Sequence, residues 1–363
     1  MVYPFAPAFA RGLGVPVAAI YQLVVIRNLA GFLSPLFSPL SAKYGRRTVM
    51  AGSMFFFVAG CVIVIIWPTY WLLGVSLSVI GLAKVIYDPA MQSYVGDAVP
   101  YAQRGKAIAV TELSWAGALL IGAPAVGFAI RQWGWNAPFF WLAIFGLGAA
   151  VSVWKLLPAA KTDQHQQGNT LREMGQIVRR HPVIWAACVY IVLATMANEI
   201  VFLVFGDWLE GSFGLNLLAL GFSASVIGFA EISGEVAAGW SVDRFGKRPV
   251  IIATGLLNAL FTLLLPFSGF NLTFVLITYF LLFLFFEITI VGGVPLMTEL
   301  VPTARSVVMS SLLAGSALGR GVGAWLGPLL FKHWSFVANG VVASLLMTVA
   351  IIILWRWVKE GTT

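Results

Sequence analysis

Apolar stretches of about 20 residues recur along the whole chain, separated by short segments rich in glycine, proline and basic residues. A helix of that length crosses the hydrocarbon core of a bilayer, whereas the strands of a membrane β-barrel are much shorter and alternate in polarity. The sequence therefore predicts an all-α membrane protein. We expect eleven complete spans, over residues 16–41, 48–67, 70–95, 107–130, 137–157, 183–205, 216–240, 249–268, 272–297, 306–331 and 336–357.

The composition excludes a soluble globular domain, because such a domain needs a charged surface. Of the 363 residues 60% are hydrophobic and 10% are charged, against roughly a quarter charged in soluble proteins. The net charge of +8 comes from short basic clusters between apolar runs, which argues against a nucleic-acid-binding module. Cys61 and Cys188 lie in apolar runs without the spacing of a disulfide framework or a metal site.

Lysine and arginine gather in alternate loops, and such loops are typically cytoplasmic. The basic loops of one parity contain Lys43, Arg46, Arg47, Arg104, Lys106, Lys155, Lys161, Arg172, Arg179, Arg180, Arg244, Lys247, Arg248, Arg305, Arg356 and Lys359. The loops of the other parity contain only Arg11, Arg131 and Lys332. We therefore expect a multi-pass protein of a bacterial-type cytoplasmic membrane, with its C-terminus in the cytoplasm.

Two segments depart from this pattern of spans. The apolar segment Met1–Ala10 is about half a span long and reads as the outer end of a severed helix, or else the protein has eleven spans and an unusual N-terminus. Residues 158–182 form the one long polar stretch, which predicts a cytoplasmic linker. The expected organisation is an N-terminal transmembrane bundle over 1–157, this linker, and a C-terminal bundle over 183–363.

Two segments of the first half recur in the second half, in the same order. Ser38–Arg47 aligns without gaps to Gly239–Arg248. Asp97–Arg104 aligns to Glu299–Arg305 with one residue deleted. Two independent matches indicate an internal duplication, and parallel repeats of a helix bundle are typical of transporters.

The second copy, Gly-Trp-Ser-Val-Asp-Arg-Phe-Gly-Lys-Arg, resembles the signature loop between the second and third helices of each half in the major facilitator superfamily. The resemblance covers nearly the whole chain and implies two pseudo-symmetric six-helix bundles around a central cavity that opens alternately to either side. It also implies that the missing piece is most of the first helix. The residues that carry the pattern are Gly239, Asp243, Arg244, Gly246, Lys247 and Arg248.

The first copy departs from the family pattern. Ser38 replaces the glycine and Ala42 the aspartate, which leaves Gly45, Arg46 and Arg47. A carboxylate at a helix end can bridge a neighbouring helix terminus and arginines, and so hold a gate closed until the bundles move. Alanine cannot do this, so a charge latch is weakened in the first half.

In the second copy we expect Asp243 to act as such a latch. Glu235 lies one turn before Gly239, where it is either a gate partner for nearby arginines or a proton site. The alternative for both basic loops is that they only fix the topology.

A run of glycine and proline follows Arg104 and is similar to a fifth-helix motif of exporters in the superfamily. This similarity favours export over import. A kinked packing surface explains the same residues, because small residues permit close helix packing and proline weakens a helix. The motif consists of Gly117, Gly122, Pro124 and Gly127.

Ionisable residues inside the predicted spans are candidates for substrate binding or proton coupling, because a charge at mid-bilayer is costly. They are Arg27, Lys84, Asp88, Glu112, Glu199, Glu231, Glu287 and Arg320. Lys84 and Asp88 share one helix face, which favours a structural ion pair. If Arg27 joins them, one surplus cation is left, either to bind an anionic group of a substrate or to respond when Asp88 is protonated.

Glu231 and Glu235 also share a helix face, where two like charges in an apolar setting favour proton binding by one of them. A carboxyl group that takes a proton from one side and releases it on the other couples transport to a proton gradient. We prefer Glu231 and Glu287 as the proton or substrate carboxylates and expect Arg320 to pair with either of them.

The chain has no Gly-x-Ser-x-Gly, His-Glu-x-x-His or Gly-x-x-x-x-Gly-Lys motif, which disfavours an enzyme and an ATP-driven pump. The sequence predicts a monomeric secondary transporter that exports a small molecule, such as a drug, an amphipathic compound or a sugar-like metabolite, in exchange for protons. No cofactor or metal is expected. The alternatives are a proton symporter or facilitator for uptake, and a lipid translocator or transporter-like receptor.

Overall fold

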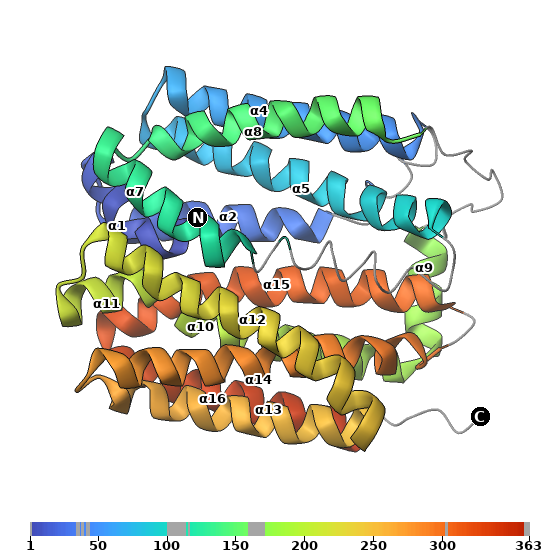
Figure 1. Cartoon of the computed structure of the whole chain (residues 1–363). Coiled ribbons are helices and arrows are strands. Elements are labelled where there is room, and N and C mark those ends of the chain that lie inside the picture. Colours follow the sequence, from blue (N-terminus) through green and yellow to red (C-terminus); the bar gives the residue numbers. More distant parts are fainter. Residues whose placement is uncertain are drawn as a thin grey trace.

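Long helices run side by side along one axis of the molecule (Figure 1). The computed structural model describes residues 2–33, 37, 40, 44–99, 114, 117–158, 171–301 and 304–358. A lipid-spanning segment must satisfy its backbone hydrogen bonds internally, and helices do this within one segment. The predicted all-α fold is confirmed.

The helices of the N-terminal half lie in the upper part of Figure 1. They are α1 (Val2–Leu13), α2 (Val17–Ala30), the 3-10 turn η1 (Gly31–Leu33), α4 (Arg46–Ile66), α5 (Tyr70–Ala98), the π-helical turn η2 (Ala118–Gly122), α7 (Ala123–Trp133) and α8 (Ala137–Leu156). The short helix α9 (Leu171–Arg180) crosses the end of the bundle, roughly perpendicular to the long helices (Figure 1).

The C-terminal half occupies the lower part of Figure 1. Its elements are α10 (Pro182–Phe202), α11 (Phe205–Phe213), α12 (Leu217–Phe245), α13 (Lys247–Leu264), the 3-10 turn η3 (Leu265–Ser268), α14 (Leu272–Thr298), α15 (Arg305–His333) and α16 (Phe336–Trp357). The predicted span over 183–205 is longer than expected, because α10 and α11 together form one apolar segment, Pro182–Phe213.

Nine helices of the described residues are long and apolar enough to cross a membrane. The shorter apolar helices Val17–Ala30 and Ala118–Trp133 belong to the predicted spans 16–41 and 107–130, which are described only in part. The nine long helices and these two therefore correspond to the eleven predicted spans, and α1, with 12 residues, is a shorter additional helix.

The two ends of the bundle differ. At one end, called here the linker end, lie α9, the start of α4 and the turn between α12 and α13. The opposite end, called the far end, holds the short turns after α1, α7 and α11, where Gly14, Gly134 and Gly214 all have positive φ. The sequence pattern predicts that the linker end faces the cytoplasm.

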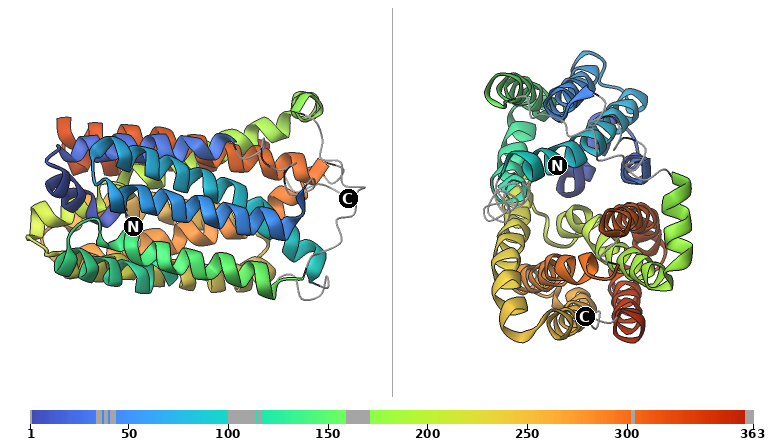
Figure 2. Two further views of the ribbon diagram at one scale, coloured as in Figure 1. Left: turned by 90° about the horizontal axis from the view of Figure 1, so that it is seen from above. Right: turned by 90° about the vertical axis from the view of Figure 1, so that its right-hand side faces the viewer.

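The two halves meet along the part of the bundle nearer the far end. The contacts join α2 to α15, α7 to α12, and α1 to α11, and Figure 2 shows both halves from the end of the bundle. Glycine permits the closest approaches. A Cβ atom on Gly206 of α11 would lie 2.2 Å from the carbonyl oxygen of Pro4, and one on Gly221 of α12 would lie 2.9 Å from Cα of Pro124.

The loops of the sequence repeat adopt the same backbone conformation. Gly45 has φ 84° and ψ 138° before α4, and Gly246 has φ 87° and ψ 150° before α13. This region of backbone space is accessible essentially only to glycine. Arg47 then donates a 3.1 Å hydrogen bond to the carbonyl oxygen of Leu157, at the end of the last helix of its half. Arg248 donates equivalently to the carbonyl oxygen of Trp355.

We expect Gly246→Ala to destabilise the protein by about 1 to 3 kcal/mol, because alanine disfavours the backbone conformation at this position. Gly239→Ala is the matched control within the same loop motif. Gly239 lies in the interior of α12 with nothing within 4 Å of its Cβ position, and alanine is the better helix former. Thermal unfolding of the purified variants in one detergent measures both effects, and an unchanged melting temperature for Gly246→Ala contradicts the backbone argument.

Candidate functional site

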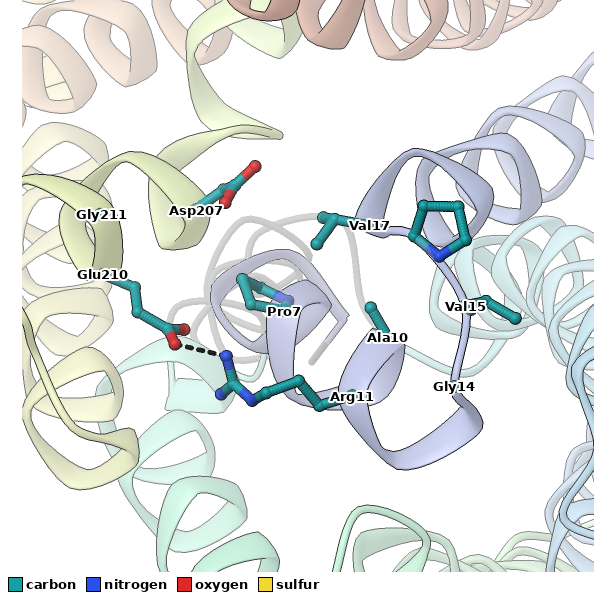
Figure 3. Close-up of a pocket in the computed structure, with 10 residues that line it drawn as sticks. Pro7, Ala10, Arg11, Gly14, Val15, Val17, Asp207, Glu210 and Gly211 are labelled. Carbon is teal, nitrogen blue, oxygen red and sulfur yellow. Dashed lines mark hydrogen bonds and ion pairs between the residues drawn. The ribbon is translucent and has the colours of Figure 1, made fainter.

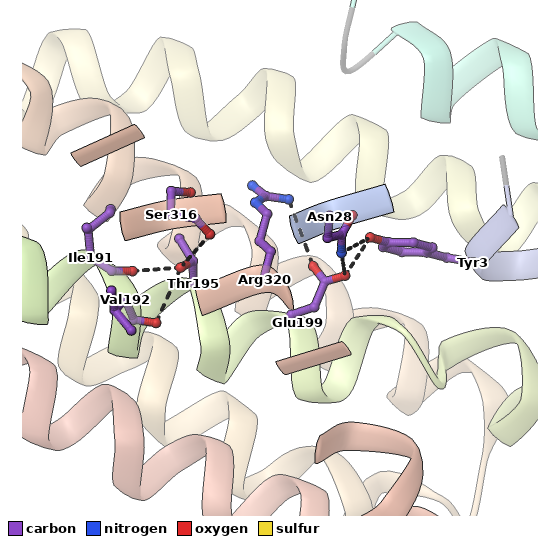
Figure 4. Close-up of polar contacts among 8 residues, drawn as sticks. All are labelled: Tyr3, Asn28, Ile191, Val192, Thr195, Glu199, Ser316 and Arg320. Atoms are coloured by element: carbon purple, nitrogen blue, oxygen red, sulfur yellow. Dashed lines mark hydrogen bonds and ion pairs between the residues drawn. The ribbon is translucent and has the colours of Figure 1, made fainter. Parts of the chain in front are cut away.

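Glu199 of α10 lies at the contact between the two halves and is completely buried, with 0% of its side chain exposed. Its Oε1 atom accepts hydrogen bonds from the hydroxyl of Tyr3, at 2.5 Å, and from Nδ2 of Asn28, at 3.0 Å. The guanidinium of Arg320 lies 3.9 Å from Oε2. Figure 4 shows these side chains converging on the carboxyl group from α1, α2 and α15.

The partners of Glu199 come from both halves of the protein. Tyr3 and Asn28 belong to the N-terminal half, whereas Arg320 belongs to the C-terminal half together with Glu199. The Oε2 atom accepts no hydrogen bond from the residues that the structure describes. Burial penalises an ionised carboxylate, and hydrogen-bond donors and cations stabilise it. The charge on Glu199 therefore depends on how the two halves are placed.

A second charged group lies next to this site. Lys84 and Asp88 of α5 form the expected ion pair one turn apart, and their side chains are 40% and 36% exposed. Arg27 packs on the same helix, because a Cβ atom on Gly81 would lie 3.0 Å from its Cγ. Its guanidinium also lies 5.9 Å from the centre of the Tyr3 ring. Arg27 and Arg320 both act electrostatically on Lys84.

The predicted pairing of Arg320 with Glu231 or Glu287 stays a prediction, and Arg320 has a further neighbour. Its carboxylate partner is Glu199, because α15 packs closely on α10: a Cβ atom on Gly323 would lie 2.8 Å from Cβ of Glu199. Glu231 is half-buried and lies within the electrostatic range of Arg320. Glu287 is half-buried on α14 and packs against α12, where a Cβ atom on Gly234 would lie 2.6 Å from its Cβ.

In the signature loop of the second half, charge contacts involve the basic residues more than the aspartate. Lys247 forms a 2.6 Å ion pair with Glu299, a residue of the second repeated segment. Arg244 lies 5.5 Å from the centre of the Trp240 ring. Asp243 is exposed and has no hydrogen bond or ion pair within the described part of the chain. Its latch role stays a prediction.

The other predicted gating residues lie close to this loop or to its counterpart. Glu235 is half-buried and lies within the electrostatic range of Glu231, one turn before the exposed Gly239. In the first half, Arg46 donates a hydrogen bond to the carbonyl oxygen of Ser93.

The predicted exporter motif lies where α7 and α12 meet. Pro124 contacts Gly221, and a Cβ atom on Gly127 would lie 2.5 Å from the carbonyl oxygen of Leu217. Gly117 and Gly122 have open space around their Cβ positions. Only the second part of the motif therefore forms a close packing surface between the halves. The residues named in the sequence analysis that lie outside the described residues include Ser38, Ala42, Lys43, Arg104, Lys106, Glu112, Lys161 and Lys359.

Polar contacts also join the halves at the far end, around a cavity of about 430 Å³ (Figure 3). Arg11 of α1 pairs with Glu210 of α11. Tyr21 of α2 donates a 3.3 Å hydrogen bond to Asp207 of α11. Both contacts connect the N-terminal half to α11.

Sequence reasoning missed the partners of the central and far-end carboxylates. Asn28 had a signal, since it follows Arg27 inside an apolar span. Asp207 and Glu210 had a weaker one, because the apolar pattern continues beyond the predicted end of the span at 205. Tyr3 had none, since its contact depends on the placement of α1 against α10.

Comparisons with known proteins agree with this architecture. A family model described as the Major Facilitator Superfamily matches residues 1–230 and 187–363. The chain is 27% identical over 356 residues to YwfA of Bacillus subtilis, an uncharacterized MFS-type transporter. The aligned residues cover 95% of this chain and 84% of that protein. It is 25% identical over 258 residues to YbcL of the same bacterium, also an uncharacterized MFS-type transporter, covering 70% of this chain and 65% of that protein.

Two solved structures share the fold at low sequence identity. The human organic anion transporter MFSD10 has a TM-score of 0.72 at 16% identity, covering 96% of this chain and 88% of that chain. The xylose transporter XylE from E. coli, in a partially occluded inward open conformation, has a TM-score of 0.77 at 15% identity, covering 100% of this chain and 94% of that chain. With its two halves, its repeated loops and a family match over its whole length, this membrane protein belongs to the Major Facilitator Superfamily.

Proposed function

We propose that the protein is a secondary active transporter that exports small molecules across the cytoplasmic membrane by alternating access, in exchange for protons. The observation that carries this proposal is the environment of Glu199. Its carboxyl group is fully buried, and it is held by donors from one half and by a cation from the other. This arrangement links the proton on Glu199 to the relative position of the halves.

The link follows from which groups move together. If the halves separate at the far end, Tyr3 and Asn28 move away from Glu199 with the N-terminal half, and Arg320 stays with it. Water then reaches the carboxyl group and the cost of its charge changes. A group that binds a proton more tightly in one conformation than in the other shifts the conformational equilibrium when it is protonated.

The basic loops give the orientation of the bundle, and a sequence motif favours a direction of transport. The basic loops predict that the linker end faces the cytoplasm, so the contacts between the halves near the far end close the outer side in this state. The sequence over 117–127 is similar to an exporter motif, and its Pro124 and Gly127 lie in that contact. The sign of flux under an imposed pH gradient distinguishes export from uptake.

The first test is transport into and out of proteoliposomes with and without an imposed proton gradient. Glu199→Gln keeps the size of the side chain and removes its charge. We expect gradient-driven flux to fall at least about tenfold in this variant, since a positioned proton-transfer group typically contributes about a hundredfold or more to a rate. Exchange of substrate without a gradient should persist, because binding does not require the proton cycle.

Glu287→Gln is the comparison variant, because the contact of Glu287 with Gly234 lies within its own half. We expect this variant to keep most of the gradient-driven flux. Loss in Glu287→Gln or in Glu231→Gln, with normal flux in Glu199→Gln, would assign the proton to another carboxylate. Flux indifferent to the gradient in the unchanged protein would leave a facilitator.

The second test locks the halves together at the contact between η1 and α15. A Cβ atom on Gly31 would lie 2.9 Å from Cβ of Ala317, close to the separation within a disulfide of about 3.5 to 4.5 Å. We expect Gly31→Cys with Ala317→Cys, introduced in a background without Cys61 and Cys188, to abolish transport after oxidation. Flux should return on reduction.

The two single-cysteine variants are the controls, since they carry the same side chains without a crosslink. A crosslinked protein that transports normally would show that this contact stays closed throughout the cycle. Such a result would overturn alternating access by separation of α2 from α15.

A further inference from the structure

A small apolar cavity lies inside the C-terminal half, between α10, α14 and α15. Its volume is about 140 Å³, comparable to an apolar cavity of about 150 Å³ that holds one benzene molecule in another protein. The residues that line it are Tyr190, Ile191, Ile290, Gly293, Val294, Met297, Met309, Leu312, Leu313 and Ser316. A single aromatic ring or a branched alkyl group fits this volume.

One lining residue is polar and buried. Tyr190 is 2% exposed, and its hydroxyl group has no hydrogen-bond partner among the described residues. An unpaired buried hydroxyl is costly in an apolar core. Methionine at two positions, Met297 and Met309, gives the wall an adaptable surface. These features are typical of a ligand subsite more than of a tightly packed core.

Two helices, α10 and α15, contribute residues both to the cavity and to the charged site. Ser316 lines the cavity, and Arg320 lies one turn further along the same face of α15. One turn corresponds to roughly 5 to 6 Å along the helix axis. Between them, Thr195 of α10 donates a 3.3 Å hydrogen bond to the carbonyl oxygen of Ser316 and holds the two helices in register (Figure 4).

Arg320 is a cation at this end of the cavity, and the half-buried carboxylates Glu231 and Glu287 lie on the neighbouring helices α12 and α14. The side chain of Arg320 is 45% exposed, whereas its carboxylate partner Glu199 is 0% exposed. Glu231 lies within the electrostatic range of Arg320 but forms no ion pair with it in the described part of the chain. A ligand therefore meets a half-exposed guanidinium, which offers paired donors to a carboxylate, a sulfonate or a phosphate.

From this juxtaposition we infer that the transported substrates are amphipathic organic anions, with an apolar ring or branched chain in the Tyr190 cavity and an acidic head group on Arg320. The inference rests on the proposed transport function and names its substrate class. The hydroxyl of Tyr190 serves as a hydrogen-bond donor to a polar atom on the ring. Glu199 and the acidic head group then compete for Arg320.

Three probes share one phenylalkyl body and differ in their head group. They therefore distinguish the contribution of the head group to binding from that of the ring. They are 4-phenylbutyrate, 4-phenylbutylamine and 4-phenylbutanol, in which three or four methylene groups span roughly the rise of one helical turn. Binding is measured as the concentration-dependent rise in melting temperature of the protein in lipid nanodiscs, which requires no transport. We expect the acid to bind at least about tenfold more tightly than the amine or the alcohol.

Two pairs of variants assign the parts of the site. Arg320→Met should weaken binding of the acid at least about tenfold and leave the alcohol unchanged, and Arg320→Lys should retain part of the preference. Gly293→Val fills the cavity and should weaken all three probes. Gly52→Val is its matched control, since Gly52 lies on α4 of the other half with open space at its Cβ position.

The outcomes separate this inference from the proposed function. Tighter binding of the amine, or acid binding that is indifferent to Arg320→Met, overturns the inference even if gradient-driven flux is found. The expected binding pattern in a protein that shows no flux leaves the subsite standing and overturns the transport proposal. Equal weakening by Gly293→Val and Gly52→Val shows that the cavity is not the binding site.

Discussion

The burial of one carboxyl group determines which polar side chains must lie at the centre of this protein. Glu199 has no exposed surface, and an ionised carboxylate without water requires donors or cations nearby. Three helices other than its own supply them: α1 through Tyr3, α2 through Asn28 and α15 through Arg320. Since these helices belong to different halves, the site is complete only when the halves are in contact.

That contact is built from backbone surfaces more than from long side chains. Gly206, Gly221 and Gly127 each bring a helix so close to its neighbour that a Cβ atom would clash. Without a hydrophobic driving force between helices in lipid, such close packing is a main source of association. The arrangement also favours reversibility, because helices that meet through small residues separate without disentangling side chains.

Local features of the fold could be predicted from the sequence, and long-range ones could not. The spans follow from the length of apolar runs, and the Lys84–Asp88 pair follows from their spacing on one helix. The partner of Arg320 depends on which face α15 turns toward α10, which a single sequence does not specify. The contact of Tyr3 with Glu199 joins residues 196 positions apart.

The paired arginines of the repeated loops have a mechanical consequence. Arg47 and Arg248 each tie the beginning of a half's third helix to the end of its sixth. A half closed in this way resists sliding between its own helices and turns as a single lever. In the proposed movement of the halves, a small displacement near the middle of α15 would therefore correspond to a larger one at the ends of the bundle.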